Sequence, residues 1–326
     1  MGGRRHGDVA ALLWVVTVIS VLVTGAGGFI GSRVLAAANG SACRVIPISR
    51  RPSGPQFRVL DLAGPLDGLP KVDWVFHLAG GYAGASAESL EQSDYEVTRR
   101  LIAWGRSARV RNWVFASAAE VYGTCAEPAT EDSPTRPVIP YGRIKREIER
   151  MFGTLAREDS ESRVAVLRIG EVYGGNGNLV NELTRRFRSG FCPWFGSGDV
   201  PVSFVHVDDV ARAFWCALRE VPRGFSVWNV ADEMPATWRE FLDHFAGLLG
   251  TRKAVGLPLS LSRAYAAAST IADRARGRSP TVTQHVVSLL TTSKPMSSRK
   301  ARDHLGLRLE YPEFRIGLRE VLDREP

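Results

Sequence analysis

The chain has 326 residues, of which 44% are hydrophobic and 23% charged, the composition of an ordinary globular protein with one large domain or two smaller ones. Its four cysteines (43, 125, 192 and 216) form no C-x-x-C pair, which argues against a zinc site or a disulfide framework and fits a reducing cytoplasm. The net charge of +8 comes from 37 arginines and five lysines without an aromatic-interleaved basic stripe, so we expect no nucleic-acid partner.

An apolar run of 15 residues, "VAALLWVVTVISVLV", occupies Val9–Val23. A membrane-spanning helix needs about 20 such residues, and this run continues directly into a glycine-rich turn without a cleavage site. Its second half therefore predicts a buried parallel strand over Val18–Thr24. We expect residues 1–16 to be a dispensable leader and the protein to have no membrane anchor.

Three glycines follow this strand as G-x-x-G-x-x-G: Gly25, Gly28 and Gly31. They open a predicted helix over Phe29–Ala38 that ends at Asn39-Gly40. Glycines let the backbone approach a pyrophosphate, and the N-terminus of the helix supplies N–H groups and a positive potential. This turn therefore predicts a dinucleotide cofactor.

The residues after the second predicted strand, Arg44–Ser49, indicate which dinucleotide binds. An acidic residue at this point favours NAD by binding the adenosine ribose, but this chain has Ser49, Arg50 and Arg51 instead. Guanidinium groups pair well with a 2′-phosphate, so we expect NADP and regard NAD as the weaker alternative. The other interpretation is a solvated charge pair on a loop.

The first half of the chain alternates strands and helices. The further predicted strands are Phe57–Leu60, Val72–His77, Asn112–Ala116 and Val164–Ile169, and the long predicted helices are Ser86–Arg106 and Tyr141–Leu155. This alternation predicts an α/β fold with a Rossmann-type doubly wound parallel sheet.

The pattern changes after about residue 174, where glycine-rich and aromatic loops precede helical segments at 237–250 and beyond 258. We expect an NADP-binding domain of residues 17–174 plus about 203–232. A smaller, mostly helical C-terminal substrate domain would comprise about 175–202 and 233–326.

Tyr141 and Lys145 lie four residues apart in a predicted helix and so share one face. A nearby ammonium favours the phenolate and lowers the pKa of a tyrosine. Such a tyrosine can pass a proton to or from a carbonyl oxygen while hydride moves. We expect this pair to be catalytic, although a purely structural i,i+4 pair is the alternative.

An ordered set of segments over residues 18 to about 324 resembles the extended short-chain dehydrogenase/reductases, the NAD(P)-dependent epimerase/dehydratase family. The segments are "TGAGGFIG" (24–31), "DL" (61–62), "FHLAG" (76–80), "VYG" (121–123), Tyr141-x-x-x-Lys145, "LRIGEVYG" (167–174), "FVHVDDVARA" (204–213), "WNVAD" (228–232) and "SSRKARDHLGL" (297–307). The resemblance implies further cofactor contacts at Phe29, Ile30, Asp61, Leu62, Leu78, Ala79, Tyr141 and Lys145. It also implies a homodimer that pairs through the two long helices.

The chain departs from this family beside the "VYG" segment. Members usually carry a serine or threonine where this chain has Ala118, and that hydroxyl binds the substrate oxygen. Ser117 is a candidate replacement, but successive residues of a strand point to opposite sides, so a local bulge would be needed. Glu120 aligns with a glutamate that transfers protons in dehydratases, which also tend to carry an aspartate at the position of Ala119. We therefore expect Ser117 and Glu120 to be catalytic and substrate-binding, unless Glu120 is only a polar residue at the pocket rim.

A second departure concerns the substrate. Sugar-nucleotide members usually have an arginine at the position of Val202, whereas Asn178-Leu179 resembles the pair that meets the substrate diphosphate. Asn178 is therefore a candidate substrate-binding residue. The C-terminal segment also resembles that of members acting on steroid-like alcohols.

These features favour a cytoplasmic, metal-free enzyme that uses NADPH to reduce a ketone on a nucleotide-activated deoxysugar. A net reductase consumes reduced cofactor, which fits the Arg50-Arg51 signal. Three alternatives remain: a nucleotide-sugar epimerase or dehydratase, a hydroxysteroid-type or other small-alcohol dehydrogenase, and, because of Ala118, a non-catalytic NADP-binding regulator. The fold alone does not decide among them.

Overall fold

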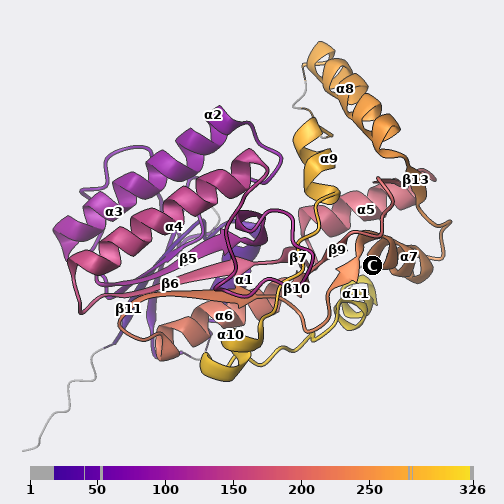
Figure 1. Ribbon diagram of the computed structural model, residues 1–326. Helices are drawn as coiled ribbons and strands as arrows, with labels where there is room; N and C mark the ends of the chain where they lie inside the picture. Colours follow the sequence, from indigo (N-terminus) through magenta and orange to yellow (C-terminus); the bar gives the residue numbers. More distant parts are fainter. Residues whose placement is uncertain (1–17, 40, 52–53, 278–279, 281, 324–326) are drawn as a thin grey trace, which may run out of the picture.

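A seven-stranded parallel sheet forms the centre of the computed structural model, which describes residues 18–323 except 40, 52–53, 278–279 and 281. The strand order is β11-β6-β5-β4-β1-β2-β3 (Figure 1). The strands are β1 (Ser20–Thr24), β2 (Arg44–Ser49), β3 (Arg58–Val59), β4 (Trp74–His77), β5 (Asn112–Ala118), β6 (Arg163–Ile169) and β11 (Gly224–Val230). The predicted Rossmann-type sheet is confirmed, and the leader expected at residues 1–16 lies outside the described residues.

Helices cover both faces of this sheet (Figure 1). The helices α1 (Phe29–Ala36) and α6 (Val207–Glu220) pack on one face over a core that includes Val21, Val23 and Phe76. The opposite face is covered by α3 (Val97–Ala108) and α4 (Pro140–Glu158) over Leu22, Val75 and Phe115. Alternate residues of β1 and β4 thus enter two different cores, as the pleat of a strand buried on both faces requires.

The first predicted long helix contains a π-helical segment. It consists of α2 (Ala87–Leu90), the π-helix η1 (Glu91–Glu96) and α3, and the Ser86 hydroxyl caps it by accepting the N–H of Ser89 at 3.2 Å. π-helical turns occur frequently at functional sites. Here the turn carries Asp94, which is almost completely buried.

Other helix limits differ modestly from the sequence-based ones. The helix α1 ends at Ala36, before the predicted Asn39-Gly40 stop, and Gly40 itself is not among the described residues. The helix α4 begins at Pro140, whose fixed φ suits the first helical position, and continues to Glu158.

Most of the remaining elements surround a separate aromatic core of Tyr173, Phe204, Phe241, Phe245 and Phe314, while α8 and α9 pack around a small cluster that includes Phe195, Ala266 and Val287. Three small two-stranded sheets belong here: β7 (Glu171–Tyr173) with β10 (Phe204–His206), β9 (Pro201–Val202) with β12 (Ala236–Thr237), and β8 (Pro193–Phe195) with β13 (Val255–Leu257). The helices are α5 (Asn178–Arg188), α7 (Trp238–Leu248), α8 (Leu259–Ala275), α9 (Gln284–Leu290), α10 (Arg299–His304) and α11 (Phe314–Asp323). This separate core supports the proposed substrate domain, although α10 returns to pack against β11 of the large sheet.

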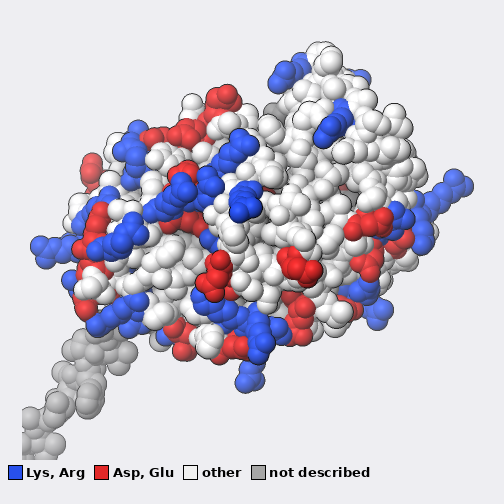
Figure 2. All heavy atoms as spheres, viewed as in Figure 1, with Lys and Arg blue, Asp and Glu red and all other residues white. Residues whose placement is uncertain are grey.

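The surface differs between these two regions. Charged side chains of both signs gather over α3 and α4, whereas the area around α9 is mostly uncharged (Figure 2). Within the described residues, no helix is both long and apolar enough to cross a membrane.

Candidate active site

The glycine turn lies where the strand order of the sheet reverses, between β1 and β4, which is the place where doubly wound sheets bind ligands. Gly25 has a φ of +66°, and a Cβ there would lie 2.7 Å from the backbone nitrogen of Ala79. A Cβ on Gly31 would collide with the carbonyl oxygen of Gly25. Because the N-cap of α1 is Gly28, which has no side chain, the first amides of the helix stay accessible. This cradle fits a pyrophosphate.

Ser49, Arg50 and Arg51 lie at the carboxyl end of β2, on the same edge of the sheet. The Ser49 hydroxyl accepts the backbone N–H of Arg51 at 3.3 Å, and both arginine side chains are exposed. Asp61 follows β3 and accepts the N–H of Ala63 at 3.0 Å, while Leu62 is buried. These side chains can reach an adenosine ribose, and their assignment to the cofactor stays a proposal.

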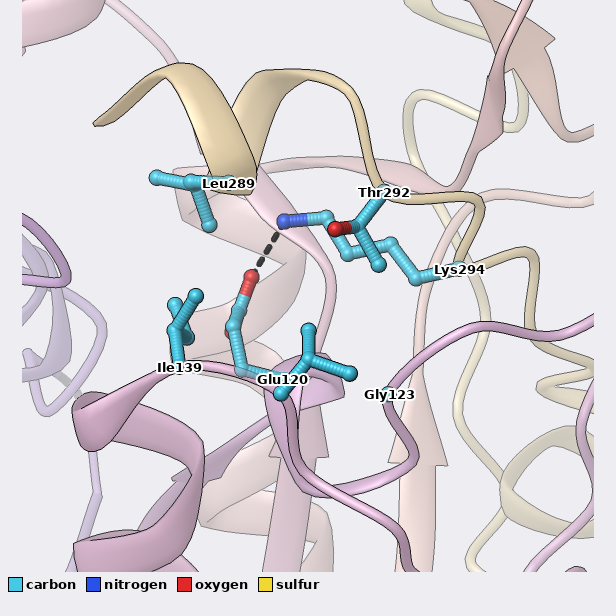
Figure 3. A pocket seen from close by; sticks show the side chains of 7 residues that line it. Glu120, Gly123, Ile139, Leu289, Thr292 and Lys294 are labelled. Carbon is cyan, nitrogen blue, oxygen red and sulfur yellow. Dashed lines mark hydrogen bonds and ion pairs between the residues drawn. The ribbon is translucent and has the colours of Figure 1, made fainter. Parts of the chain in front are cut away.

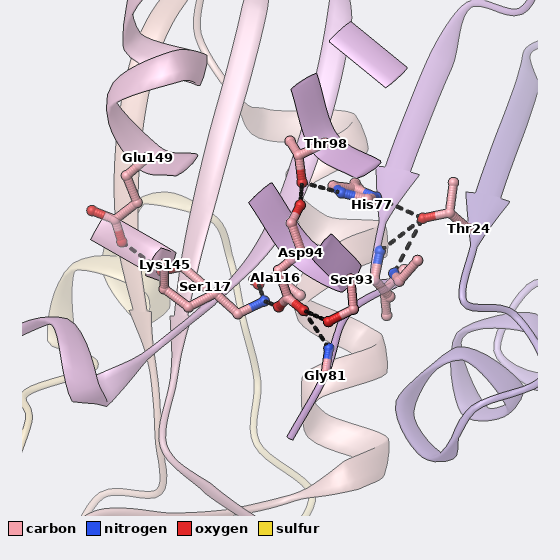
Figure 4. Close-up of polar contacts among 12 residues, drawn as sticks. Thr24, His77, Gly81, Ser93, Asp94, Thr98, Ala116, Ser117, Lys145 and Glu149 are labelled. Carbon is pink, nitrogen blue, oxygen red and sulfur yellow. Dashed lines mark hydrogen bonds and ion pairs between the residues drawn. The ribbon is translucent and has the colours of Figure 1, made fainter. Parts of the chain in front are cut away.

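A buried chain of hydrogen bonds centred on His77 supports the glycine turn (Figure 4). The backbone amides of Leu78 and Ala79 donate to the Thr24 hydroxyl, which lies 2.8 Å from His77 Nδ1. His77 Nε2 lies 2.8 Å from the Thr98 hydroxyl, which donates to a backbone carbonyl. The Thr98 hydroxyl has one proton, which it gives to that carbonyl, so it accepts a hydrogen bond from Nε2–H of His77. The Thr24 hydroxyl donates its own proton to Nδ1. The imidazole is therefore neutral and carries its proton on Nε2. Burial, together with the Lys145 charge, lowers the pKa of His77 to about 3.

Lys145 is buried beside the loop that follows β4, where a Cβ on Gly80 would lie 3.3 Å from its Nζ. Its Nζ lies 3.3 Å from Asp94 Oδ2 and donates to the carbonyl oxygen of Ala116 at 3.2 Å (Figure 4). Asp94 Oδ1 accepts the N–H of Gly81 at 2.5 Å and the Ser93 hydroxyl at 2.7 Å. Asp94 thus ties the π-helix η1 to the loop after β4 and to the lysine.

Tyr141 and Lys145 are brought together as expected, with Nζ 5.3 Å from the centre of the phenol ring. The expected lowering of the tyrosine pKa is wrong for this arrangement. Burial raises the pKa of Tyr141 well above its ordinary value, and the Glu120, Asp94 and Glu171 carboxylates raise it further. The physical reason is that Asp94 balances the charge of Lys145, so the surrounding carboxylates favour the neutral phenol.

The position of Ser117 argues against its expected role at the substrate. Its hydroxyl donates to Glu149 Oε1 at 2.5 Å, and Glu149 forms a buried ion pair of 2.7 Å with Arg168. β5 continues to Ala118 in regular register with β6, where Ser117 pairs with Arg168. No bulge interrupts this described stretch to turn the hydroxyl towards the position of Ala118. Ser117 therefore belongs to a buried polar cluster.

Glu120 lies at a pocket and forms an ion pair that the sequence did not reveal. Its carboxylate accepts from Nζ of Lys294, which also lies 3.4 Å from Glu171 Oε2. Figure 3 shows Lys294 pointing at Glu120 from the opposite wall. The pocket is lined by Glu120, Gly123, Val138, Ile139, Leu289, Thr292 and Lys294. Despite burial, Glu120 and Glu171 raise the pKa of Lys294, so it carries a full charge.

Lys294, Glu171 and Asp94 were missed by sequence reasoning. One signal was available for the lysine: lysine is scarce in a chain that otherwise uses arginine. In the structure two of the five lysines, Lys145 and Lys294, are buried. The other two residues had no comparable signal.

The two positions that bear on a nucleotide group differ in exposure. Asn178 is the exposed first residue of α5, preceded by the N-cap Gly177. Val202 is completely buried in β9, where it pairs with Ala236. The pocket around Glu120 includes neither residue.

Comparisons with known proteins identify the family and the fold of the chain. The model of the family described as "NAD dependent epimerase/dehydratase family" matches residues 21–231. The 2-alkyl-3-oxoalkanoate reductase of Stenotrophomonas maltophilia (strain K279a) is 26% identical over 316 residues, covering 88% of this chain and 94% of that protein. The structure of human epimerase family protein SDR39U1 with NADPH has a TM-score of 0.77 at 26% identity, covering 94% of this chain and all of that one. MoeE5 in complex with UDP-glucuronic acid and NAD has a TM-score of 0.76 at 27% identity, covering 93% and 98%.

Proposed function

The chain belongs to the NAD dependent epimerase/dehydratase family and is an NAD(P)-dependent enzyme of the extended short-chain dehydrogenase/reductase type, and we propose that it reduces a ketone with NADPH. The observation that carries this proposal is the charge around Tyr141. Burial and three carboxylates raise its pKa above the ordinary value, so the phenol stays protonated well into the alkaline range. A protonated phenol is the general acid that reduction of a carbonyl requires.

In this mechanism Tyr141 donates its proton to the carbonyl oxygen of the substrate, which becomes a hydroxyl. Lys145, fixed by Asp94 and the carbonyl oxygen of Ala116, lies beside the ring and orients the site. The glycine cradle and the amides at the start of α1 would hold the cofactor, which supplies the hydride when bound.

The choice of NADPH over NADH rests on Arg50 and Arg51. Both guanidinium groups are exposed at the end of β2, where the 2′-phosphate of an adenosine would lie. The two structural relatives described above carry NADPH in one case and NAD in the other, so family membership alone does not select the cofactor.

The first candidate substrate is a ketone on a nucleotide-activated deoxysugar. Asn178 at the exposed N-terminus of α5 supports it, as does the nucleotide sugar held by MoeE5. The second candidate is a smaller ketone without a nucleotide. Val202 favours this candidate, because a buried apolar side chain stands where a cationic one would bind a nucleotide. A relative that matches over 94% of its own length is also named as a 2-alkyl-3-oxoalkanoate reductase.

The test is NADPH consumption with a panel of a nucleotide-linked 4-keto-6-deoxysugar, a 2-alkyl-3-oxoalkanoate and a cyclic ketone. For at least one of these ketones, we expect the amount of NADPH oxidised, followed by its absorbance, to equal the amount of alcohol formed. Conversion of a nucleotide sugar without net loss of NADPH would instead identify an epimerase. Binding of NADPH without turnover of any ketone would indicate a regulator.

We also propose a homodimer that pairs through α3 and α4, which lie side by side on the outer face of the sheet (Figure 1). Two such helices from each copy would form a four-helix interface. Sedimentation equilibrium should then give twice the mass of one chain, and a single-chain mass at micromolar concentration would reject the proposal.

A further inference from the structure

The backbone around Lys294 is held firmly between two parts of the molecule. The N–H of Lys294 donates to the carbonyl oxygen of Pro201 in β9 at 2.9 Å. On either side, the N–H of Cys125 donates to Ser293 and the N–H of Ala129 donates to Pro295, both at 2.8 Å. The segment from the C-terminal half is thereby fixed against the loop that follows β5, and Lys294 enters the pocket from a defined direction (Figure 3).

The ammonium of Lys294 has one N–H donor left for a ligand. Its side chain is only 2% exposed, yet it lines the pocket together with Glu120. A lysine carries three N–H donors, and among the described residues Glu120 and Glu171 accept two of them. The third can donate to a ligand oxygen. Glu120 reaches Lys294 through Oε1, and its second carboxylate oxygen can accept a hydrogen bond from a ligand hydroxyl.

The charge of this cluster limits what the pocket can accept. Two carboxylates, Glu120 and Glu171, face one ammonium, so an anionic ligand group would meet net repulsion. Of the other lining side chains, Val138, Ile139 and Leu289 are apolar, and the Thr292 hydroxyl already donates its proton to the carbonyl oxygen of Ser288. A neutral hydroxyl satisfies both sides, because it accepts from Lys294 and donates to Glu120.

We propose that Lys294 is a substrate-binding residue that, with Glu120, recognises a hydroxyl next to the reacting ketone, so that the enzyme selects hydroxyketones over simple ketones. This inference rests on the ketone reduction proposed above and names the substrate class of the same site. Tyr141, whose phenol is close enough to Glu120 and Glu171 to be affected by their charges, protonates the carbonyl oxygen, and Lys294 fixes the neighbouring oxygen. The loss of one such contact leaves buried polar groups unpaired, which is how a site rejects an analogue that lacks the hydroxyl.

The test compares 2-hydroxycyclohexanone with cyclohexanone as substrates in the presence of saturating NADPH. The wild type should prefer the hydroxyketone by about 10-fold or more in kcat/KM. Lys294→Met should reduce this preference to nearly one, because the donor is lost. The matched control is Lys300→Met, since Lys300 donates to the carbonyl oxygen of Val227 beside Trp228 and does not line the pocket. It should keep the wild-type preference.

If Lys294 only supports the structure, Lys294→Met should lower kcat/KM equally for both substrates and leave their ratio unchanged. That result would overturn the inference. An equal rate for both ketones in the wild type would also overturn it, while ketone reduction would stand. If Lys294→Met does not fold, Lys294→Arg replaces it, because arginine retains the charge but displaces the donors. This variant should still lower the preference for the hydroxyketone several-fold. An unchanged preference would contradict the inference.

A binding measurement separates this inference from the proposed function. Calorimetry of trans-1,2-cyclohexanediol with the NADP-loaded enzyme reports on the hydroxyl contact without turnover. Weaker binding to Lys294→Met than to Lys300→Met supports the inference even if no ketone in the panel consumes NADPH. Equal binding to both variants rejects it.

Discussion

The ammonium of Lys145 lies 3.3 Å from the carboxylate of Asp94, and both side chains are almost completely buried. The pair changes the electrostatics expected from Tyr141 and Lys145 alone. A lysine near a tyrosine favours the phenolate, but this lysine is balanced by a carboxylate that the π-helix η1 brings to the end of the sheet. The tyrosine therefore stays protonated, which suits a proton donor in reduction.

Asp94→Asn should lower the pKa of Tyr141, because one of the carboxylates that raise it is removed. In the proposed reaction the phenol must be protonated, so kcat falls as the pH rises through the pKa of Tyr141. The variant should move this alkaline limb to lower pH. The measurement is kcat against pH at saturating NADPH and ketone.

The matched control for this shift is Asp303→Asn, since Asp303 is an exposed residue of α10 that pairs with Arg299. Its profile should overlay that of the wild type. An alkaline limb that stays in place or moves upward in Asp94→Asn would contradict the electrostatic role given to Asp94.

Tyr141→Phe should cut turnover by something like 10²–10⁴-fold, because it removes the proton donor and keeps the ring. The dissociation constant of NADPH, measured by fluorescence, should change by no more than a few-fold. Tyr265→Phe is the control, since Tyr265 on α8 packs against Phe195 away from the catalytic pair. Full activity in Tyr141→Phe would remove the basis of the catalytic assignment.

The catalytic pair and the glycine turn could be predicted from the sequence because they depend on local rules. A spacing of four places Tyr141 and Lys145 on one helical face, and Gly25 and Gly31 are required by a turn that no other residue fits. The alternation of strand residues also indicated correctly that Ser117 would need a bulge to replace Ala118, and no bulge is present in that strand.

The rest of the site depends on contacts between distant segments, which local patterns do not encode. Lys294 meets Glu120 across 174 positions of the chain. Asp94 reaches Lys145 only because a π-helical turn interrupts an otherwise regular helix, and amphipathic periodicity did not indicate that turn. The pKa of Tyr141 could not be predicted for the same reason, since it is raised first by burial and then by the charges of Glu120, Asp94 and Glu171, all of which depend on the tertiary fold.

Replacing Arg50 and Arg51 together with alanine should weaken NADPH binding by roughly 10- to 150-fold, the loss expected for hydrogen bonds between charged groups. NADH binding should change by less than about threefold, because NADH lacks the 2′-phosphate. Equilibrium titrations of both cofactors measure this. Equal affinity of the wild type for NADH and NADPH would refute the assigned preference.

Ser117→Ala should lower stability and leave turnover unchanged. The hydroxyl donates to a buried carboxylate, Glu149, and its loss should cost about 1–3 kcal/mol of unfolding free energy. Urea unfolding and kcat are the two measurements. Ser107→Ala is the control, since that exposed hydroxyl donates only to the carbonyl oxygen of Trp104. A fall in kcat of Ser117→Ala at full stability would restore the catalytic role.

The stability of the protein should decline on acidification because of His77. Burial, with the charge of Lys145, lowers its pKa in the folded state from 6.5 to about 3, so between these values the unfolded chain binds a proton that the folded protein does not. The free energy of unfolding is therefore lost progressively as the pH falls below 6.5, by up to about 1.4 kcal/mol per pH unit from this group. Urea unfolding of wild type and His77→Asn at pH 7, 6, 5 and 4 isolates the contribution, since the carboxylates titrate in both. As the pH falls, the unfolding free energy of the wild type should decrease more steeply than that of His77→Asn, by the slope that corresponds to about one bound proton. Parallel curves for the two proteins would show that the hydrogen bonds from Thr24 to Thr98 do not hold His77 neutral.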